Sequence, residues 1–337
     1  LGSVMIYNEL SPSVQAKGYH RYIRFNLLNG LSFGLLADNV LILYCLKVGM
    51  PEYMIGIIMS FLFLTMPLML VGKQLLLRLG ASGTISLAWA ARNLSALVMA
   101  LAPLLIPFVP MVVVLGLITL GAFGFFAFRS VGMIATRPLV GEITTEANRG
   151  RFMASQGLSF NVTLMLGLVA LAIVLKTSNT LETFQCILAI GCLAGLASSV
   201  ILATIPESGR PRKSAAIPVN KALSALWQNR SQRKLLMAQA GGLGAIVLVL
   251  PICTVALKEV YQATEHTAIL FVIAQVGGSV LISMIFGVLA DRTGPRPLLI
   301  IFGAGLLLIA LLWAVAPPVF SWPYLLFIFF FSGTFRY

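Results

Sequence analysis

Asp38 is the acidic residue that lies deepest in the long apolar runs of this 337-residue sequence. Its run covers residues 25–46. At about 1.5 Å per residue, Asp38 lies roughly 20 Å from Arg24, beyond the middle of a bilayer core about 30 Å thick. An ionisable side chain at that depth usually marks a functional site, and Asn39 beside it could supply a hydrogen bond. The alternative is a permanent ion pair with Arg92, which lies at a similar depth in the third run.

Other polar side chains inside the apolar runs could contact a solute or tie helices together. Arg129 lies near the inner end of the fourth run, where a long side chain can also reach the membrane surface. Uncharged polar residues in such runs most often link helices, at about 0.6 kcal/mol on average. These residues are Gln156 and Asn161 in the fifth run, Gln239 in the seventh and Gln275 in the eighth. The two histidines and four cysteines have no spacing that indicates a catalytic or metal site.

The elements that must hold these residues are membrane-spanning helices. Hydrophobic residues make up 59% of the sequence and charged residues 10%, with a mean hydropathy of +0.98. Soluble domains have roughly 45 to 50% apolar residues and about 25% charged residues. A span needs about 20 apolar residues. The sequence therefore predicts an all-α, polytopic transmembrane bundle with nine complete spans and the start of a tenth at Pro323. The nine cover approximately residues 25–46, 53–72, 83–106, 111–135, 152–175, 183–205, 235–257, 268–289 and 298–316.

The basic residues indicate the orientation of these spans. With the N-terminus inside, 18 of the 23 Lys and Arg residues fall on the inner side, and only Lys47, Lys176 and Lys258 fall outside. The net charge of +13 is thus explained by membrane topology, and no nucleic-acid partner is expected. We expect a multi-pass protein of the cell membrane, inner or plasma, with a cytoplasmic N-terminus.

A polar stretch over residues 206–234 divides the chain. It separates six predicted spans in residues 1–205 from a partial second half in residues 235–337, and we expect it to be a cytoplasmic linker. Inside it, residues 219–226 have apolar side chains at helical spacing, which is typical of a short helix along the inner membrane surface. A loosely ordered linker is the alternative.

The most specific motif lies at the inner end of the eighth predicted span and in the loop after it. Its residues are Gly287, Asp291, Arg292, Gly294 and Arg296. Glycines allow close helix packing and a tight turn, while the aspartate and arginines can pair at the membrane edge. The run resembles the G-x-x-x-D-R-x-G-R-R signature of the major facilitator superfamily of secondary transporters. An altered copy follows the second span, where Arg78 and Gly80 match but Leu77 replaces the aspartate.

Two further runs resemble that superfamily, and its sugar porters in particular. Glu142 and Arg149 stand in an E-x-x-x-x-x-x-R-G pattern between the fourth and fifth spans, and Pro206-Glu207-Ser208 follows the sixth. The seventh span lacks the glutamine and aromatic pattern of sugar porters.

The resemblance implies two six-helix halves around a central cavity that work by alternating access. It implies that the first helix lines this cavity, so that Asp38 would carry a proton or contact the substrate, and that the motif residues serve conformational change. The partners would be a small-molecule substrate, protons and the lipid bilayer, for a monomer without a cofactor. Because the second half would be incomplete, we expect the chain to be C-terminally truncated.

Other functions stay open at this point. A ten-helix drug/metabolite carrier would suit the length, although the Asp-Arg-x-Gly loop and the long linker argue against a fold that repeats every five helices. A non-transporting membrane receptor and an inactive fragment are further alternatives. An enzymatic role is not expected, because no nucleophile, metal or phosphate-loop pattern accompanies the histidines.

Overall fold

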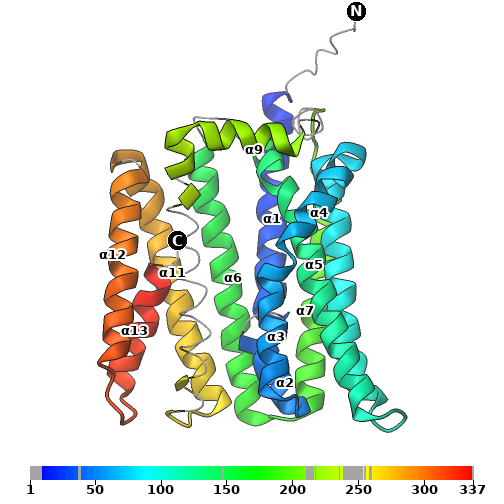
Figure 1. Cartoon of the computed structure of the whole chain (residues 1–337), viewed down its shortest axis with the longest axis vertical. Coiled ribbons are helices and arrows are strands. Elements are labelled where there is room, and N and C mark those ends of the chain that lie inside the picture. The colour runs from blue at the N-terminus through cyan, green and yellow to red at the C-terminus, as the bar shows by residue number, and fades with distance from the viewer. Residues whose placement is uncertain are drawn as a thin grey trace, which may run out of the picture. The chain divides into compact units, whose positions relative to one another are not determined.

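The computed structural model describes residues 10–36, 39–145, 148–209, 216, 218–234, 236–237, 253, 256–257, 260–293 and 295–335. Every regular element in these residues is a helix, which confirms the predicted all-α class (Figure 1). The helices are α1 (Pro12–Leu36), α2 (Asn39–Val48), α3 (Glu52–Leu64), η1 (Met66–Leu68), α4 (Met69–Leu101), η2 (Ala102–Leu105), α5 (Met111–Ile143), α6 (Arg149–Thr177), α7 (Leu181–Ala203), α9 (Val219–Gln228), α11 (Glu265–Thr293), α12 (Pro295–Ala314) and α13 (Trp322–Thr334).

Six helical segments in the described part of the chain are long and apolar enough to cross a membrane. They are Pro12–Val48, Glu52–Leu105, Met111–Ile143, Arg149–Thr177, Leu181–Ala203 and His266–Ile285. The second contains two of the predicted spans, since 54 residues of helix would be about 80 Å long. Ile300–Ala314 and Trp322–Thr334 are shorter apolar helices. The predicted span over residues 235–257 lies almost entirely outside the described residues.

Gly80 separates the second span from the third. Its backbone has φ 79° and ψ −177°, so α4 consists of two helices that meet at a sharp turn. This backbone conformation is essentially restricted to glycine. The turn ends one apolar run and starts the next at the same membrane surface.

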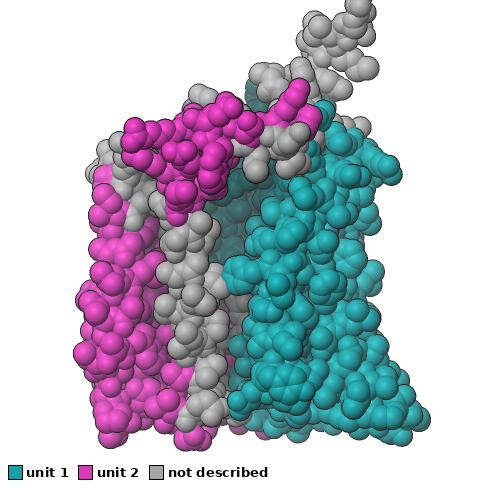
Figure 2. Space-filling model, viewed as in Figure 1, with its two compact units in different colours: residues 1–164, 178–216 teal, residues 165–177, 217–337 magenta. Residues whose placement is uncertain are grey.

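The helices form two compact units (Figure 2). Unit 1 consists of Leu1–Leu164 and Ser178–Ala216, and unit 2 of Met165–Thr177 and Ile217–Tyr337. The helix α6 contributes its first part to unit 1 and its last part to unit 2. The division at residues 205 and 234 that the sequence indicates concerns membrane halves, and it stays a prediction.

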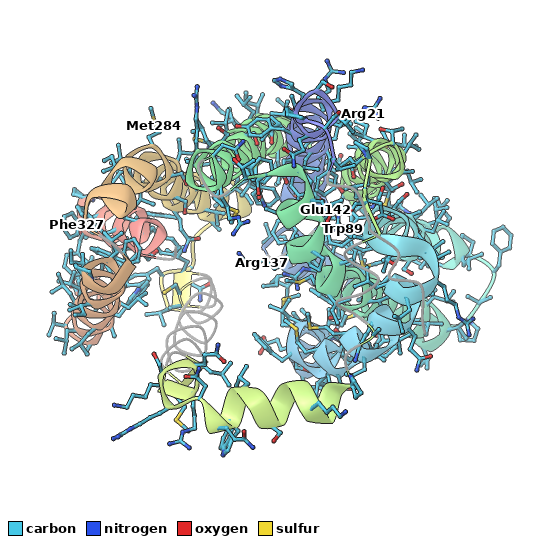
Figure 3. The ribbon with its side chains drawn as sticks, turned by 90° about the horizontal axis from the view of Figure 1, so that it is seen from above. Arg21, Trp89, Arg137, Glu142, Met284 and Phe327 are labelled. Carbon is cyan, nitrogen blue, oxygen red and sulfur yellow. The ribbon has the colours of Figure 1, made fainter. Side chains whose placement is uncertain are left out.

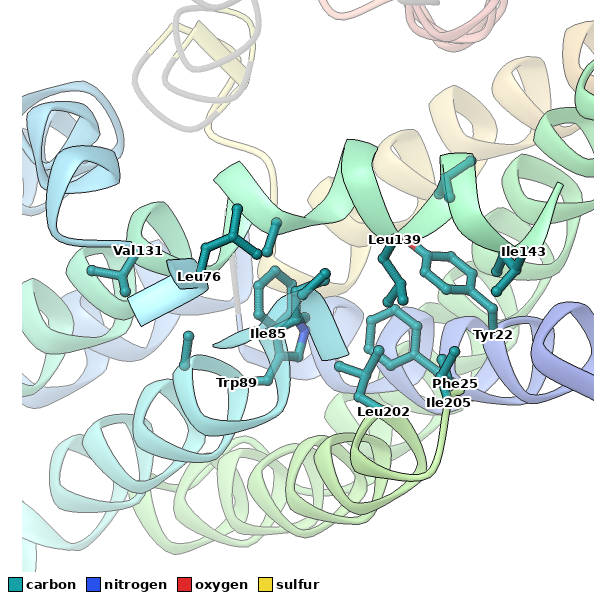
Figure 4. Close-up of a cluster of buried hydrophobic side chains, with 14 of the residues drawn as sticks. Tyr22, Phe25, Leu76, Ile85, Trp89, Val131, Leu139, Ile143, Leu202 and Ile205 are labelled. Carbon is teal, nitrogen blue, oxygen red and sulfur yellow. The ribbon is translucent and has the colours of Figure 1, made fainter. Parts of the chain in front are cut away.

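Unit 1 has an apolar core that several helices share. The helix α4 packs against α5 and α7, and α1 packs against α7. Buried side chains from all four helices meet near one end of the unit (Figure 4). Among them are Tyr22, Phe25, Ile85, Trp89, Leu139, Ile143 and Leu202. This core fixes the helices that carry the polar residues described below.

Unit 2 is held by close contact between α11 and α13. A Cβ at Gly278 would lie 2.0 Å from the Phe330 carbonyl oxygen, and one at Gly333 would lie 1.7 Å from that of Gln275. Small residues thus let the two backbones touch, as is common between helices in membranes.

Candidate functional site

Arg92 is the most deeply buried charged side chain in the described part of the chain. It lies on α4 with 1% of its surface exposed. It is eleven residues beyond Ala81, where the third span begins, and so about 16 Å along that helix. A position this close to the middle of the membrane cannot be solvated by extending the side chain to the surface.

Two aromatic rings and one amide surround the Arg92 guanidinium. Its central carbon lies 5.0 Å from the ring centroid of Trp89 and 4.9 Å from that of Phe125. Its Nη2 donates to Asn29 Oδ1 at 3.3 Å, and the Trp89 indole donates to the same oxygen at 2.9 Å. The buried Nε of Arg92 has no hydrogen-bond acceptor among the described residues. The charge is therefore held mainly by π faces and one shared amide oxygen.

A second amide extends this cluster to α7. Asn93 accepts from Ser32 Oγ at 3.3 Å and donates to the Trp89 carbonyl at 2.7 Å. A Cβ at Gly195 would lie 2.0 Å from Asn93 Oδ1, so only glycine leaves room for this side chain. Together, Asn29, Ser32, Trp89, Arg92 and Asn93 form a buried polar cluster that joins α1 to α4 by hydrogen bonds and packs against α7 at Gly195.

Arg129 on α5 adds a second positive charge to this region. Arg129 is close enough to Arg92 for the two positive charges to repel each other. The thiol of Cys192 on α7 also interacts electrostatically with Arg92. No acidic side chain among the described residues forms an ion pair with Arg92. Arg92 and Arg129 together bring two basic side chains to that part of unit 1.

A separate network surrounds the Pro206-Glu207-Ser208 run, at the end of unit 1 where α5 and α7 end. Glu207 Oε2 accepts from the backbone N–H groups of Ala81 at 2.6 Å and Ser82 at 2.9 Å. These are orphan donors at the start of a helix, where a carboxylate also meets the positive end of the helix dipole. A Cβ at Gly80 would lie 1.7 Å from Glu207 Oε1.

Glu142 ties the end of α5 to the same run. Only 8% of Glu142 is exposed, and its Oε2 accepts from the Ser208 backbone N–H at 2.8 Å. Glu142 and Arg137 lie on the last turns of α5, as Figure 3 shows from above. Glu142 and Glu207 therefore join the start of the third span, the end of α5 and the segment after α7.

A family comparison identifies this helical architecture. The sequence model of the Major Facilitator Superfamily matches residues 93–336. The chain belongs to the major facilitator superfamily. A comparison with curated proteins found no match.

Solved structures of superfamily transporters share the fold of this superfamily member. The proton:xylose symporter XylE, bound to 6-bromo-6-deoxy-D-glucose, is 15% identical with a TM-score of 0.65, over 97% of this chain and 80% of that one. The nucleoside transporter NupG is 12% identical with a TM-score of 0.68, over 95% of this chain and 80% of that one. The E. coli fucose:proton symporter FucP is 14% identical with a TM-score of 0.66, over 96% of this chain and 82% of that one. At these identities the likeness concerns the fold.

The remaining predicted site residues of this superfamily member are only partly described. Asp38, Gln239 and the side chain of Asn39 lie outside the described residues, so the proposed pair between Asp38 and Arg92 stays a prediction. Gln156 and Asn161 lie on α6. The buried Gln156 Oε1 accepts no hydrogen bond from the described residues.

In unit 2, Gln275 links helices. It is 6% exposed on α11, and its Nε2 donates to Ser332 Oγ of α13 at 3.1 Å. This contact fits the helix-linking alternative for the residue. Arg149 begins α6 as an exposed residue.

The superfamily motif lies where α11 meets α12. The helix α11 ends at Thr293 and α12 begins at Pro295, so the predicted loop is a very short connection. The side chains of Asp291, Arg292 and Arg296, and all of Gly294, lie outside the described residues. The helix α11 also contains Gly287.

Sequence reasoning missed Asn29, Ser32 and Asn93 and did not assign a role to Glu207. A signal was present for the first three. Trp89, Arg92 and Asn93 have the i, i+3, i+4 spacing of one helix face, as do Asn29, Ser32 and Phe33. Polar residues at that spacing inside an apolar run indicate a buried polar contact.

Proposed function

We propose that this superfamily member is a secondary active transporter of a small polar solute, that it works by alternating access, and that it is coupled to protons through Asp38. The observation that supports the proposal most directly is the buried Arg92 cluster. An arginine at the centre of a span costs about 2.5 to 3.5 kcal/mol on insertion scales, so such residues usually serve function.

Proton coupling is supported by the electrostatics of unit 1. The positive charges of Arg92 and Arg129 favour the ionised form of a carboxylate on the same bundle. Solute binding that shields or displaces these charges would change the proton affinity of Asp38. The solute is proposed to be polar because XylE, FucP and NupG are named for xylose, fucose and nucleosides.

The test uses the chain in liposomes that contain a pH-sensitive dye. Xylose, fucose and uridine are added outside in turn, and both proton movement and solute counterflow are recorded. We expect Asp38→Asn to abolish solute-driven proton movement but to keep counterflow, which needs no net proton transfer. Glu52→Gln, an exposed carboxylate at the start of α3, is the matched control. Proton-driven uptake that is unchanged in Asp38→Asn would remove proton coupling through this residue.

We also propose that Glu142 and Arg149, with the motif from Gly287 to Arg296, govern the conformational change. The Glu142 to Ser208 hydrogen bond supports this, because it fastens the inner end of one unit so that the unit can move as a body. Glu142→Gln should slow counterflow while the protein stays folded. Equal counterflow rates in Glu142→Gln and Glu52→Gln would contradict it.

The proposed setting is the cell membrane, with the N-terminus in the cytoplasm and the protein as a monomer. The distribution of basic residues supports the orientation. An impermeant thiol reagent applied to intact cells should label a cysteine placed at Lys47 and should not label one placed at Lys17. The reverse labelling pattern would invert the topology.

A further inference from the structure

The segment that contains α9 has an unusual charge pattern. Between Glu207 and Glu259 the sequence has no acidic residue, whereas residues 208–234 contain seven Lys and Arg residues. Lys221, Arg230 and Lys234 are exposed in the structure. This part of the chain therefore has a positive potential that no neighbouring carboxylate in the sequence offsets.

The same segment has an apolar face. In α9, apolar residues recur at positions 219, 222, 223, 226 and 227, which follows the i, i+3, i+4, i+7 and i+8 pattern of one helix face. Trp227 at its end is 54% exposed. Tryptophan prefers the level of the lipid headgroups, because its ring is apolar and its N–H is polar. In Figure 1, α9 runs across the direction of α11, α12 and α13 of the same unit.

Asn229 turns the chain after α9 and starts a further helical turn. Its Oδ1 accepts from the backbone N–H groups of Ser231 at 3.1 Å and Gln232 at 3.2 Å. This turn brings Arg233 back over Trp227, with the guanidinium carbon 6.0 Å from the ring centroid. Beyond it, Leu236 and Met237 are exposed at 44% and 58%.

We infer that residues 219–234, with Leu236 and Met237, form a surface that binds anionic phospholipids of the inner leaflet. The apolar face of α9, with Trp227, enters the interfacial region. The guanidinium and ammonium groups of Arg230, Arg233 and Lys234 pair with lipid phosphates and with acidic headgroups. Arg233, stacked on Trp227, is held at the depth where those phosphates lie. This surface would fix the segment between the halves to the membrane, whatever solute is carried.

The test measures quenching of Trp227 by brominated lipids in the full chain. The protein is placed in nanodiscs of phosphatidylcholine that contain a fixed fraction of brominated phosphatidylcholine or of brominated phosphatidylglycerol. Subtracting the signal of Trp227→Phe isolates this residue from the other three tryptophans. We expect stronger quenching by the brominated anionic lipid. Each basic residue near the membrane surface should raise the local concentration of anionic lipid about fivefold.

Charge removal gives the matched comparison. The triple variant Arg230→Gln, Arg233→Gln and Lys234→Gln should lose at least about tenfold of the anionic preference. Lys47→Gln with Lys176→Gln, both exposed at the predicted outer ends of spans, should keep it. In the parent, raising salt to about 1 M, where the Debye length is about 3 Å, should weaken the preference without any substitution.

Two outcomes would overturn the inference. Equal quenching by the two brominated lipids in the parent would show that the surface does not select anionic headgroups. Quenching of Trp227 by neither lipid would show that the surface faces water or another protein. Both readouts are independent of solute transport, so failure of the transport proposal would leave them intact.

Discussion

Glu207 gives the sharpest test of the network around the Pro206-Glu207-Ser208 run, because one carboxylate oxygen accepts two backbone donors. Replacing Glu207 by Ala leaves the Ala81 and Ser82 N–H groups without this acceptor. Replacing it by Gln keeps an acceptor oxygen but removes the negative charge from the helix N-terminus. The two variants therefore separate the hydrogen bonds from the charge.

The magnitude follows from the geometry. Hydrogen bonds to a charged partner are worth about 1.5 to 3 kcal/mol, and loss of a helix cap costs about 0.5 to 2 kcal/mol. Glu207 is only half-buried, so the lower part of these ranges applies. We expect Glu207→Ala to cost about 2 kcal/mol. Glu207→Gln should cost about 1 kcal/mol, mostly the lost interaction with the helix dipole.

Two measurements check these values. Hydrogen exchange at the Ala81 and Ser82 amides should accelerate about 30-fold in Glu207→Ala, since 1.4 kcal/mol corresponds to a factor of 10. The melting temperature of the purified protein should fall by about 4 to 8 °C, using about 2 to 4 °C per kcal/mol for a unit of this size.

The control is Glu52→Gln, which removes an exposed carboxylate from the first turn of α3. It should shift the melting temperature by less than about 2 °C. If Glu207→Ala behaved like this control, and the Ala81 amide exchanged at the parent rate, Glu207 would not be capping the third span.

Three further predictions concern positions where the packing leaves no freedom. Gly80→Ala should destabilise unit 1 by about 1 to 3 kcal/mol through backbone strain. In the control Gly56→Ala on α3, the added methyl group meets no atom within 4 Å, so this change should be neutral or stabilising. Thermal melts compare the two variants. Gly333→Ala should separate α11 from α13, seen as expanded or aggregated protein that elutes earlier in size exclusion, while Gly303→Ala should not. Arg92→Lys should lose transport in counterflow although the charge is kept, because an ammonium cannot stack between two rings as a guanidinium does.

Each of these would be contradicted by a specific result. A Gly80→Ala protein that melts with the parent would mean that the turn can be made with negative φ. Unchanged elution of Gly333→Ala would mean that the two helices have room to separate without consequence. Full counterflow in Arg92→Lys would show that only the charge at that position matters.

The sequence alone determined the fold class and the long apolar helices. In a bilayer every backbone donor and acceptor must be satisfied within the protein, so a run of about 20 apolar residues can only be a helix. Composition and spacing therefore predicted the long helices, and the motifs around Glu142, Asp291 and Glu207 indicated the superfamily that residues 93–336 match. The turn at Gly80 was also within reach, because glycine stands there in the altered copy of the motif.

Only the tertiary structure decided which polar groups meet. Glu207 caps a helix that begins 126 residues earlier in the chain. Arg92 and Trp89 share the acceptor Asn29 Oδ1, which lies 63 residues before Arg92 in the chain. Periodicity places each residue on a face of its own helix, but not against a particular neighbour. The neighbour is fixed by close packing, such as the approach of Gly195 to Asn93, which depends on several helices at once.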